Sequence, residues 1–124
     1  MRQEAKTWWE QAKSDLKTAH HSFDAKDFDW SCFQAQQSVE KAFKALYLQE
    51  FAELRKVHDL VFLAQKLQVP SDYIPFCAWL NKVYVMARYP DASDIIPAKK
   101  FSREDAKKAI EVATTILQWL EKKL

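Results

Sequence analysis

The amino-acid sequence predicts an all-α protein, folded as an antiparallel bundle of helices. The chain of 124 residues contains no glycine, on which tight hairpins and phosphate-binding loops depend for positive φ or close backbone approach. Apolar residues instead recur at steps of three and four along several long stretches, which is the pattern of amphipathic helices. Only short connections separate these stretches, so neighbouring helices are expected to pack antiparallel.

Length and composition limit the class of protein. Hydrophobic residues make up 48% of the chain, which is enough for one core, and we expect a single domain over residues 1–124. The net charge of +2 argues against a histone-like polycation. No apolar run approaches the roughly 18 residues of a membrane span and no signal segment is present, which predicts a cytoplasmic protein without a membrane partner. Cys32 and Cys77 lie in apolar runs and are predicted to be buried, reduced thiols.

The first predicted helix spans Gln3 to Ala25. Its apolar stripe consists of Ala5, Trp9, Ala12, Leu16, Ala19 and Phe23. Polar residues then break the pattern. Asp27 or Asp29 is a candidate N-cap for the next helix, because its carboxylate can accept from the free amides of a first turn.

The second predicted helix, from Phe28 to Phe51, is the longest, and the other elements are expected to pack around it. Its apolar stripe consists of Cys32, Ala35, Val39, Ala42, Phe43 and Leu46. A second row at i, i+4 spacing is polar and consists of Gln36, Glu40 and Lys44, with Gln37 and Lys41 beside it. This polar row is either a solvated face or a site, and the spacing alone leaves both interpretations open.

The second half of the chain predicts a short helix over residues 58–67 and a longer one over residues 72–89, where Pro90 ends it. The longer helix is apolar nearly all round, which indicates either a central position or a subunit interface. Residues 90–101 are expected to form a loop. Asp59 is a candidate cap for the short helix, with His58 hydrogen-bonded nearby.

The last predicted helix begins at a capping-box pattern formed by Ser102 and Asp105 and runs to the C-terminus. Its apolar stripe consists of Ala106, Ala109, Ile110, Ala113, Ile116, Leu117, Leu120 and Leu124. Basic residues gather around its start. They form either a weak anion or partner patch or a solvated face, and the candidates are Lys99, Lys100, Arg103 and Lys107.

No sequence motif for a metal or cofactor is present, and none is expected. His20 and Asp24 are one helical turn apart, but a lone pair of ligands is weak evidence for a metal site. The run Arg88-Tyr89-Pro90-Asp91 follows the apolar helix. Arg88 either pairs with an acid or holds a phosphate while Tyr89 stacks on a base.

Several segments together give the chain a resemblance to the HEPN domain family. They are AKSDLKTA at 12–19, CFQAQQSVEKAFKAL at 32–46, HDL at 58–60 and YVMARYPD at 84–91. The resemblance implies an up-and-down bundle of four main helices with a short extra helix. It also implies a homodimer and a minimal nucleotidyltransferase as partner in a toxin–antitoxin pair.

The resemblance implies an Arg-x4-6-His motif for the ribonuclease members of the family, and this sequence departs from it. Counted from Arg88, the histidine position falls on Ser93, Asp94 or Ile95, and Arg55 precedes His58 by only three positions. We therefore expect a non-catalytic binding module for a nucleotide or for the partner. The alternative is an RNA-cleaving enzyme with an atypical site, built from Arg88 with His58 or Asp91.

The resemblance and the helical spacing together suggest which side chains line the binding cleft. One wall would come from the polar side of the second helix and the other from the end of the fourth. The candidate residues are Gln37, Glu40, Lys41, Lys44, Arg88, Tyr89 and Asp91.

Overall fold

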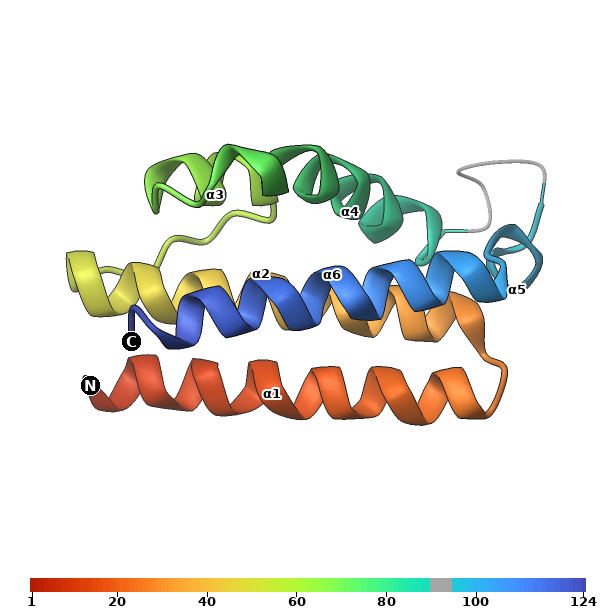
Figure 1. The fold of residues 1–124 in the computed structure, drawn as a ribbon, viewed down its shortest axis with the longest axis horizontal. Helices are drawn as coiled ribbons and strands as arrows, with labels where there is room; N and C mark the ends of the chain where they lie inside the picture. The colour runs from red at the N-terminus through yellow and green to blue at the C-terminus, as the bar shows by residue number, and fades with distance from the viewer. Residues whose placement is uncertain (90–94) are drawn as a thin grey trace.

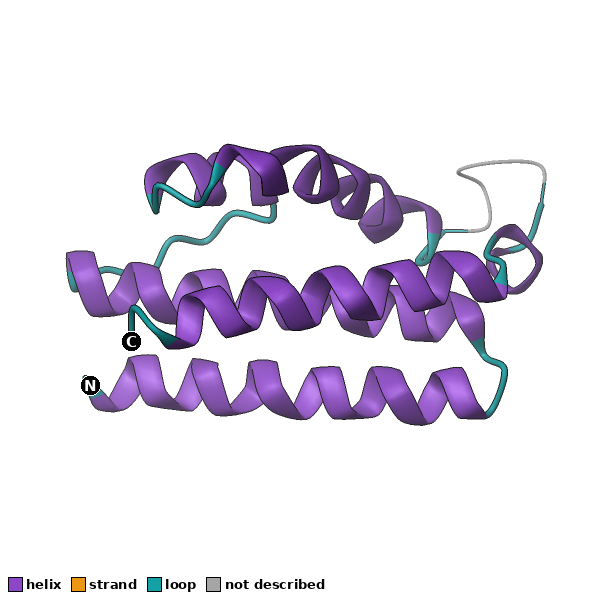
Figure 2. Ribbon diagram, viewed as in Figure 1, coloured by secondary structure: helices purple, strands orange, loops and turns teal. Residues whose placement is uncertain are grey.

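The predicted all-α fold is confirmed by a computed structural model, which describes residues 1–89 and 95–124. The described residues form helices and loops, with no strand among them (Figure 2). A 3-10 turn, Ser71–Tyr73, leads directly into the fourth helix. The α-helices are α1 (Gln3–Asp24), α2 (Phe28–Phe51), α3 (Leu60–Lys66), α4 (Ile74–Met86), α5 (Pro97–Lys100) and α6 (Arg103–Glu121).

The helices form an up-and-down bundle of four rods (Figure 1). The helices α1 and α2 are antiparallel, α3 and α4 together make the third rod, and α6 returns alongside α2. The two chain termini therefore lie at the same end of the bundle. This topology is the one that the resemblance implied, and α3 supplies the short extra helix.

The core is built on α2, whose predicted apolar stripe is fully buried. Three alanines of α1, Ala5, Ala12 and Ala19, are also fully buried and allow the two helices to approach closely. Two serines of α2 use this proximity. Ser31 donates its hydroxyl hydrogen to the carbonyl of Ala19 (2.9 Å), and Ser38 donates to the carbonyl of Ala12 (2.6 Å). Hydrogen bonds as well as apolar contacts therefore fix α1 against α2.

Two of the predicted helix caps are confirmed. The Ser102 hydroxyl accepts from the amide of Asp105 (3.1 Å), and the Asp105 carboxylate accepts from the amide of Ser102 (2.9 Å), which completes a capping box. The Asp59 carboxylate accepts from the amides of Val61 and Phe62 and caps α3. The capping prediction for α2 was wrong in its chemistry: Asp27 occupies the N-cap position, but its carboxylate accepts no hydrogen bond there.

Several boundaries differ from the prediction, by one residue at the end of α1 and by more in the second half of the chain, where α6 ends at Glu121. The helix α3 starts at Leu60 instead of residue 58, because Asp59 is its cap and His58 lies outside it. The fourth helix ends at Met86, and residues 71–73 before it form a 3-10 turn. The predicted loop over residues 90–101 contains the short helix α5, and residues 90–94, with Asp91, lie outside the described residues.

Left-handed residues complete three of the connections without any glycine. Lys26 after α1, Ala52 after α2 and Gln68 after α3 have φ of 66°, 54° and 56°. Non-glycine residues adopt this conformation only at a steric cost, because Cβ approaches the following carbonyl oxygen. The chain therefore ends these helices with residues that are strained locally.

The fourth helix lies on the outside of the bundle, so the central position considered for it is excluded (Figure 1). It buries Cys77, Leu80 and Val83, while Pro75, Ala78 and Val85 are exposed. Although α4 is strongly apolar, no helix of the described residues is long and apolar enough to cross a membrane.

The two cysteines are buried free thiols, as predicted. Burial raises the pKa of Cys32 to about 12, and the negative charges of Asp105 and Asp29 act in the same direction. Burial alone raises the pKa of Cys77, also to about 12. Both thiols are therefore protonated at neutral pH and are poor nucleophiles.

We expect Phe43→Ala to destabilise the protein by about 3–5 kcal/mol, because Phe43 is fully buried and its removal leaves a cavity. Urea unfolding followed by circular dichroism measures this change. Phe51→Ala is the matched control, because Phe51 lies on the same helix and is 48% exposed. An equal loss of stability in both variants would contradict the assignment of α2 as the centre of the core.

Candidate functional site

A buried charged cluster lies at the middle of α2. The Glu40 carboxylate accepts from the Lys44 ammonium (3.1 Å) and from the Gln36 amide (3.3 Å), and all three side chains are buried. The Lys44 ammonium also lies 5.5 Å from the centre of the Trp8 ring of α1, at cation–π distance. The interpretation of this row as a solvated face is therefore wrong.

His58 joins this cluster from the segment that precedes α3. Its Nδ1 lies 3.0 and 3.1 Å from the two carboxylate oxygens of Glu40. Its ring stacks on that of Tyr84 from α4, with the centroids 4.9 Å apart. The His58 side chain is nevertheless 59% exposed, so a buried carboxylate holds one ring nitrogen of an accessible imidazole. The predicted hydrogen bond of His58 exists, but its acceptor is on α2.

Tyr84 also contacts Arg88, one turn further along the chain. The Tyr84 hydroxyl accepts a hydrogen bond from Nη1 of Arg88, and the guanidinium lies over the rings of Tyr84 (4.6 Å) and Tyr89 (5.1 Å). Arg88 is exposed. Glu40, His58, Tyr84 and Arg88 thus form a continuous row, the His–Arg row, which crosses from α2 to the end of α4. Arg88 and the outer nitrogen of His58 are both polar groups that suit an anion such as phosphate.

A pocket of about 460 Å³ adjoins the Arg88 end of this row. It lies between the start of α2, the end of α4 and α5. Phe33 connects it to the His–Arg row, because its ring centroid is 6.4 Å from that of Tyr84. The lining residues are Asp29, Trp30, Phe33, Ala87, Arg88, Ile96, Pro97 and Ala98. We call this the α2–α4 pocket.

The structure divides the polar residues that were expected to line one cleft. Glu40 contacts His58 and so faces the segment before α3, and Gln37 donates to Gln36 (2.7 Å) beside it. Lys41 faces the other way and forms an ion pair with Asp15 of α1 (2.6 Å).

Lys44 likewise contacts Glu40 and Trp8 within the bundle. Neither Lys41 nor Lys44 is therefore placed beside Arg88. Of the residues of α2 that were expected to line the cleft, Glu40 and its neighbour Gln37 remain candidates.

The basic residues near the start of α6 do not form one patch. Lys100 donates to the carbonyls of Met86 and Tyr89 at the end of α4 (3.1 and 3.3 Å), while Lys99 and Lys107 are exposed on α5 and α6. Arg103 covers the Phe23 ring of α1 at 5.0 Å. Lys100 therefore serves α4 as a C-terminal cap.

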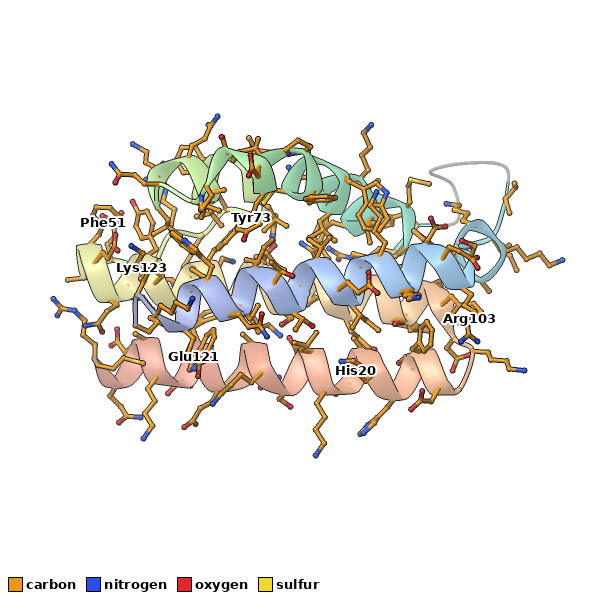
Figure 3. The ribbon with its side chains drawn as sticks, viewed as in Figure 1. His20, Phe51, Tyr73, Arg103, Glu121 and Lys123 are labelled. Atoms are coloured by element: carbon orange, nitrogen blue, oxygen red, sulfur yellow. The ribbon has the colours of Figure 1, made fainter. Side chains whose placement is uncertain are left out.

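His20 of α1 lies on the Arg103 side of the molecule (Figure 3), and both residues line a cavity of about 370 Å³. The pair of His20 and Asp24 gains no further ligand. In residues 1–89 and 95–124, no three His, Cys, Asp or Glu side chains lie close enough together to hold a metal ion.

Tyr84, Phe33 and Trp30 were not among the predicted site residues. A signal for them existed, because Trp30, Phe33 and Glu40 are spaced to share one face of α2, and Tyr84 and Arg88 are four apart in the helix predicted over residues 72–89. What the sequence could not show is that the segment before α3 brings His58 between these two faces.

The sequence profile of the HEPN domain matches residues 5–123, and the chain therefore belongs to the HEPN domain family. Two solved structures support this assignment. TT1696 from Thermus thermophilus is 34% identical with a TM-score of 0.94, over 99% of this chain and 100% of that one. ST0689, an archaeal HEPN homologue, is 30% identical with a TM-score of 0.82, over 98% of both chains. A comparison with curated proteins gives no match.

We expect Glu40→Gln to cost about 3 kcal/mol of stability, because it leaves the buried Lys44 ammonium without a charged partner. Chemical denaturation measures this loss. Glu53→Gln, at a side chain that is 61% exposed, is the control and should change little. The double variant Glu40→Gln/Lys44→Met should recover part of the loss, and strictly additive effects would show that the two groups do not interact.

Proposed function

We propose that this HEPN protein is a binding module that holds a nucleotide through its phosphate at the His–Arg row. The observation that carries the proposal is the convergence of Arg88 and His58 on one exposed surface, although they come from separate segments. A guanidinium presents a planar set of donors that suits phosphate oxygens, and the outer nitrogen of His58 adds a further polar contact.

The row also fixes the direction of these groups before any ligand arrives. Tyr84 lies between them, with its ring against the imidazole and its hydroxyl bonded to Arg88. Glu40 is buried and holds the other side of His58. Groups that are already oriented lose little side-chain entropy on binding, which favours affinity.

The proposal includes a homodimer, in which the exposed apolar side of α4 is covered by a second copy. Pro75, Ala78 and Val85 make up this side. The proposed protein partner is a minimal nucleotidyltransferase of a toxin–antitoxin pair. Sedimentation of the purified protein measures the first association, and co-purification from cells that express both proteins measures the second.

Calorimetry with nucleoside mono- and triphosphates tests the binding site. We expect Arg88→Ala to weaken nucleotide binding at least tenfold, because a charge-assisted phosphate contact is lost. Arg103→Ala is the matched control, because Arg103 also lies exposed over an aromatic ring but belongs to the α1–α6 side. Absence of nucleotide binding, or equal losses in both variants, would overturn the proposal.

A second candidate function is cleavage of RNA, which the contact between His58 and Glu40 favours. A carboxylate on Nδ1 fixes the imidazole so that its Nε2 faces outward, as acid–base chemistry requires. In this reaction Nε2 takes the proton of a 2′-hydroxyl, the 2′-oxygen bonds to phosphorus, and the bond to the 5′-oxygen breaks. The departing oxygen takes a proton from water, and Arg88 neutralises the charge on the phosphate.

Incubation of the purified protein with tRNA and mRNA distinguishes the two candidates. If the second is right, RNA is cleaved by the wild type and cleavage falls at least a hundredfold in His58→Gln and in Arg88→Ala. Nucleotide binding in His58→Gln then persists, because the Arg88 contact remains. No cleavage by the wild type, or equal cleavage by His58→Gln, rejects the enzyme and leaves the binding module.

A further inference from the structure

The α2–α4 pocket has features that the proposed phosphate contact does not use. Trp30 is 56% exposed at its edge, and its ring meets that of Phe33 edge-on, with the centroids 6.1 Å apart. An exposed indole is a good stacking partner for a planar base, and stacking by itself tolerates any base. Arg88 belongs both to the pocket lining and to the His–Arg row. A ligand held by its phosphate at Arg88 can therefore place its base in this pocket.

Asp29 supplies the chemistry that can select the base. It lies in the first turn of α2 and lines the pocket, and it is half-buried. Among the described residues it has no partner in a hydrogen bond or ion pair. An ionised carboxylate has two acceptor oxygens and no donor, so its preferred ligand presents two adjacent N–H groups.

Of the common bases, only guanine presents two adjacent donors on one edge, at N1 and N2. Adenine and cytosine place a donor beside an acceptor, and uracil has a single donor between two carbonyls. A carboxylate, which only accepts, can therefore form two hydrogen bonds with guanine. With adenine, cytosine or uracil it can form only one, and its second oxygen faces an acceptor of the base. A bidentate pair of this kind discriminates between bases by a factor of about ten or more.

We propose that the α2–α4 pocket is a guanine-binding subsite, so that the ligand of this protein is a guanine nucleotide. The base stacks on Trp30, its N1 and N2 edge donates to Asp29, and its phosphate contacts Arg88. The cavity of about 460 Å³ has the volume that small-molecule sites require, on the order of 300–1,000 Å³. This inference rests on the proposed nucleotide binding and adds the identity of the base.

The alternative occupant is an apolar segment of a protein partner, for which Trp30 and Ile96 are suitable contacts. Such a segment could offer Asp29 only backbone N–H groups and would offer Arg88 no negative charge, so burial would leave the guanidinium without an ionic partner. The presence of Asp29 and Arg88 in one lining therefore favours a ligand that carries both donors and a negative charge.

Calorimetry with GMP, AMP, CMP and UMP, supported by tryptophan fluorescence, tests the subsite. We expect GMP to bind the wild type about tenfold or more tightly than AMP. Asp29→Asn replaces one acceptor by a donor, which complements the adenine edge, so the preference should disappear or turn toward AMP. Trp30→Ala should weaken all four nucleotides at least about fivefold, because the stacking surface is removed.

Asp24→Asn is the matched control, because Asp24 is exposed at the end of α1 and away from the pocket lining, and it should leave all four affinities unchanged. Circular dichroism confirms that each variant is folded. Binding that depends on Arg88 but is equal for the four bases, or unaffected by Asp29→Asn, overturns the guanine subsite while the proposed function stands. Absence of binding by any nucleotide overturns both, and protection of Trp30 by a second copy or a protein partner then identifies the occupant.

Discussion

The carboxylate of Glu40 lies inside the protein, and the rest of the structure depends on how its charge is compensated. An unpaired charge in an apolar interior is far too costly to persist, so partners must reach it. Lys44 comes from the same helix and contacts Trp8 of α1 on its other side. His58 comes from the segment before α3 and stacks on Tyr84 of α4. One buried group thus links α2 to α1 and to the third rod, and the exposed row that ends at Arg88 is an extension of this internal pairing.

This dependence explains how a site can form without a short catalytic motif. Arg88 and His58 belong to segments that are distant in the sequence, yet Tyr84 joins them on one surface. The two candidate functions use the same phosphate contact and differ in what His58 does beyond binding. The α2–α4 pocket is lined by the start of α2, and the ligand selection that we propose for Asp29 does not depend on which role His58 has.

Much of the fold could be predicted from the sequence, because its signals are local. The bounds of α2 and the capping box at Ser102 follow from periodicity and cap chemistry within a few residues. The site was harder to predict than the fold. Helical spacing shows that Glu40 and Lys41 lie on the polar side of α2, but it does not show which other segment packs against each side chain. His58, from the segment before α3, contacts Glu40, while Lys41 reaches Asp15 of α1. Such differences arise from contacts between distant segments, which no local pattern contains.

Because the chain has no glycine, three of its connections contain backbone strain, and relief of that strain would increase the stability of the fold. Lys26, Ala52 and Gln68 each hold a left-handed backbone that glycine adopts without steric cost. Their strain is independent of the buried pairing at Glu40 and is confined to the ends of α1, α2 and α3. Replacing one of these three surface residues by glycine should therefore raise the melting temperature without changing a core side chain. A functional variant that proves too unstable to study could be rescued in this way.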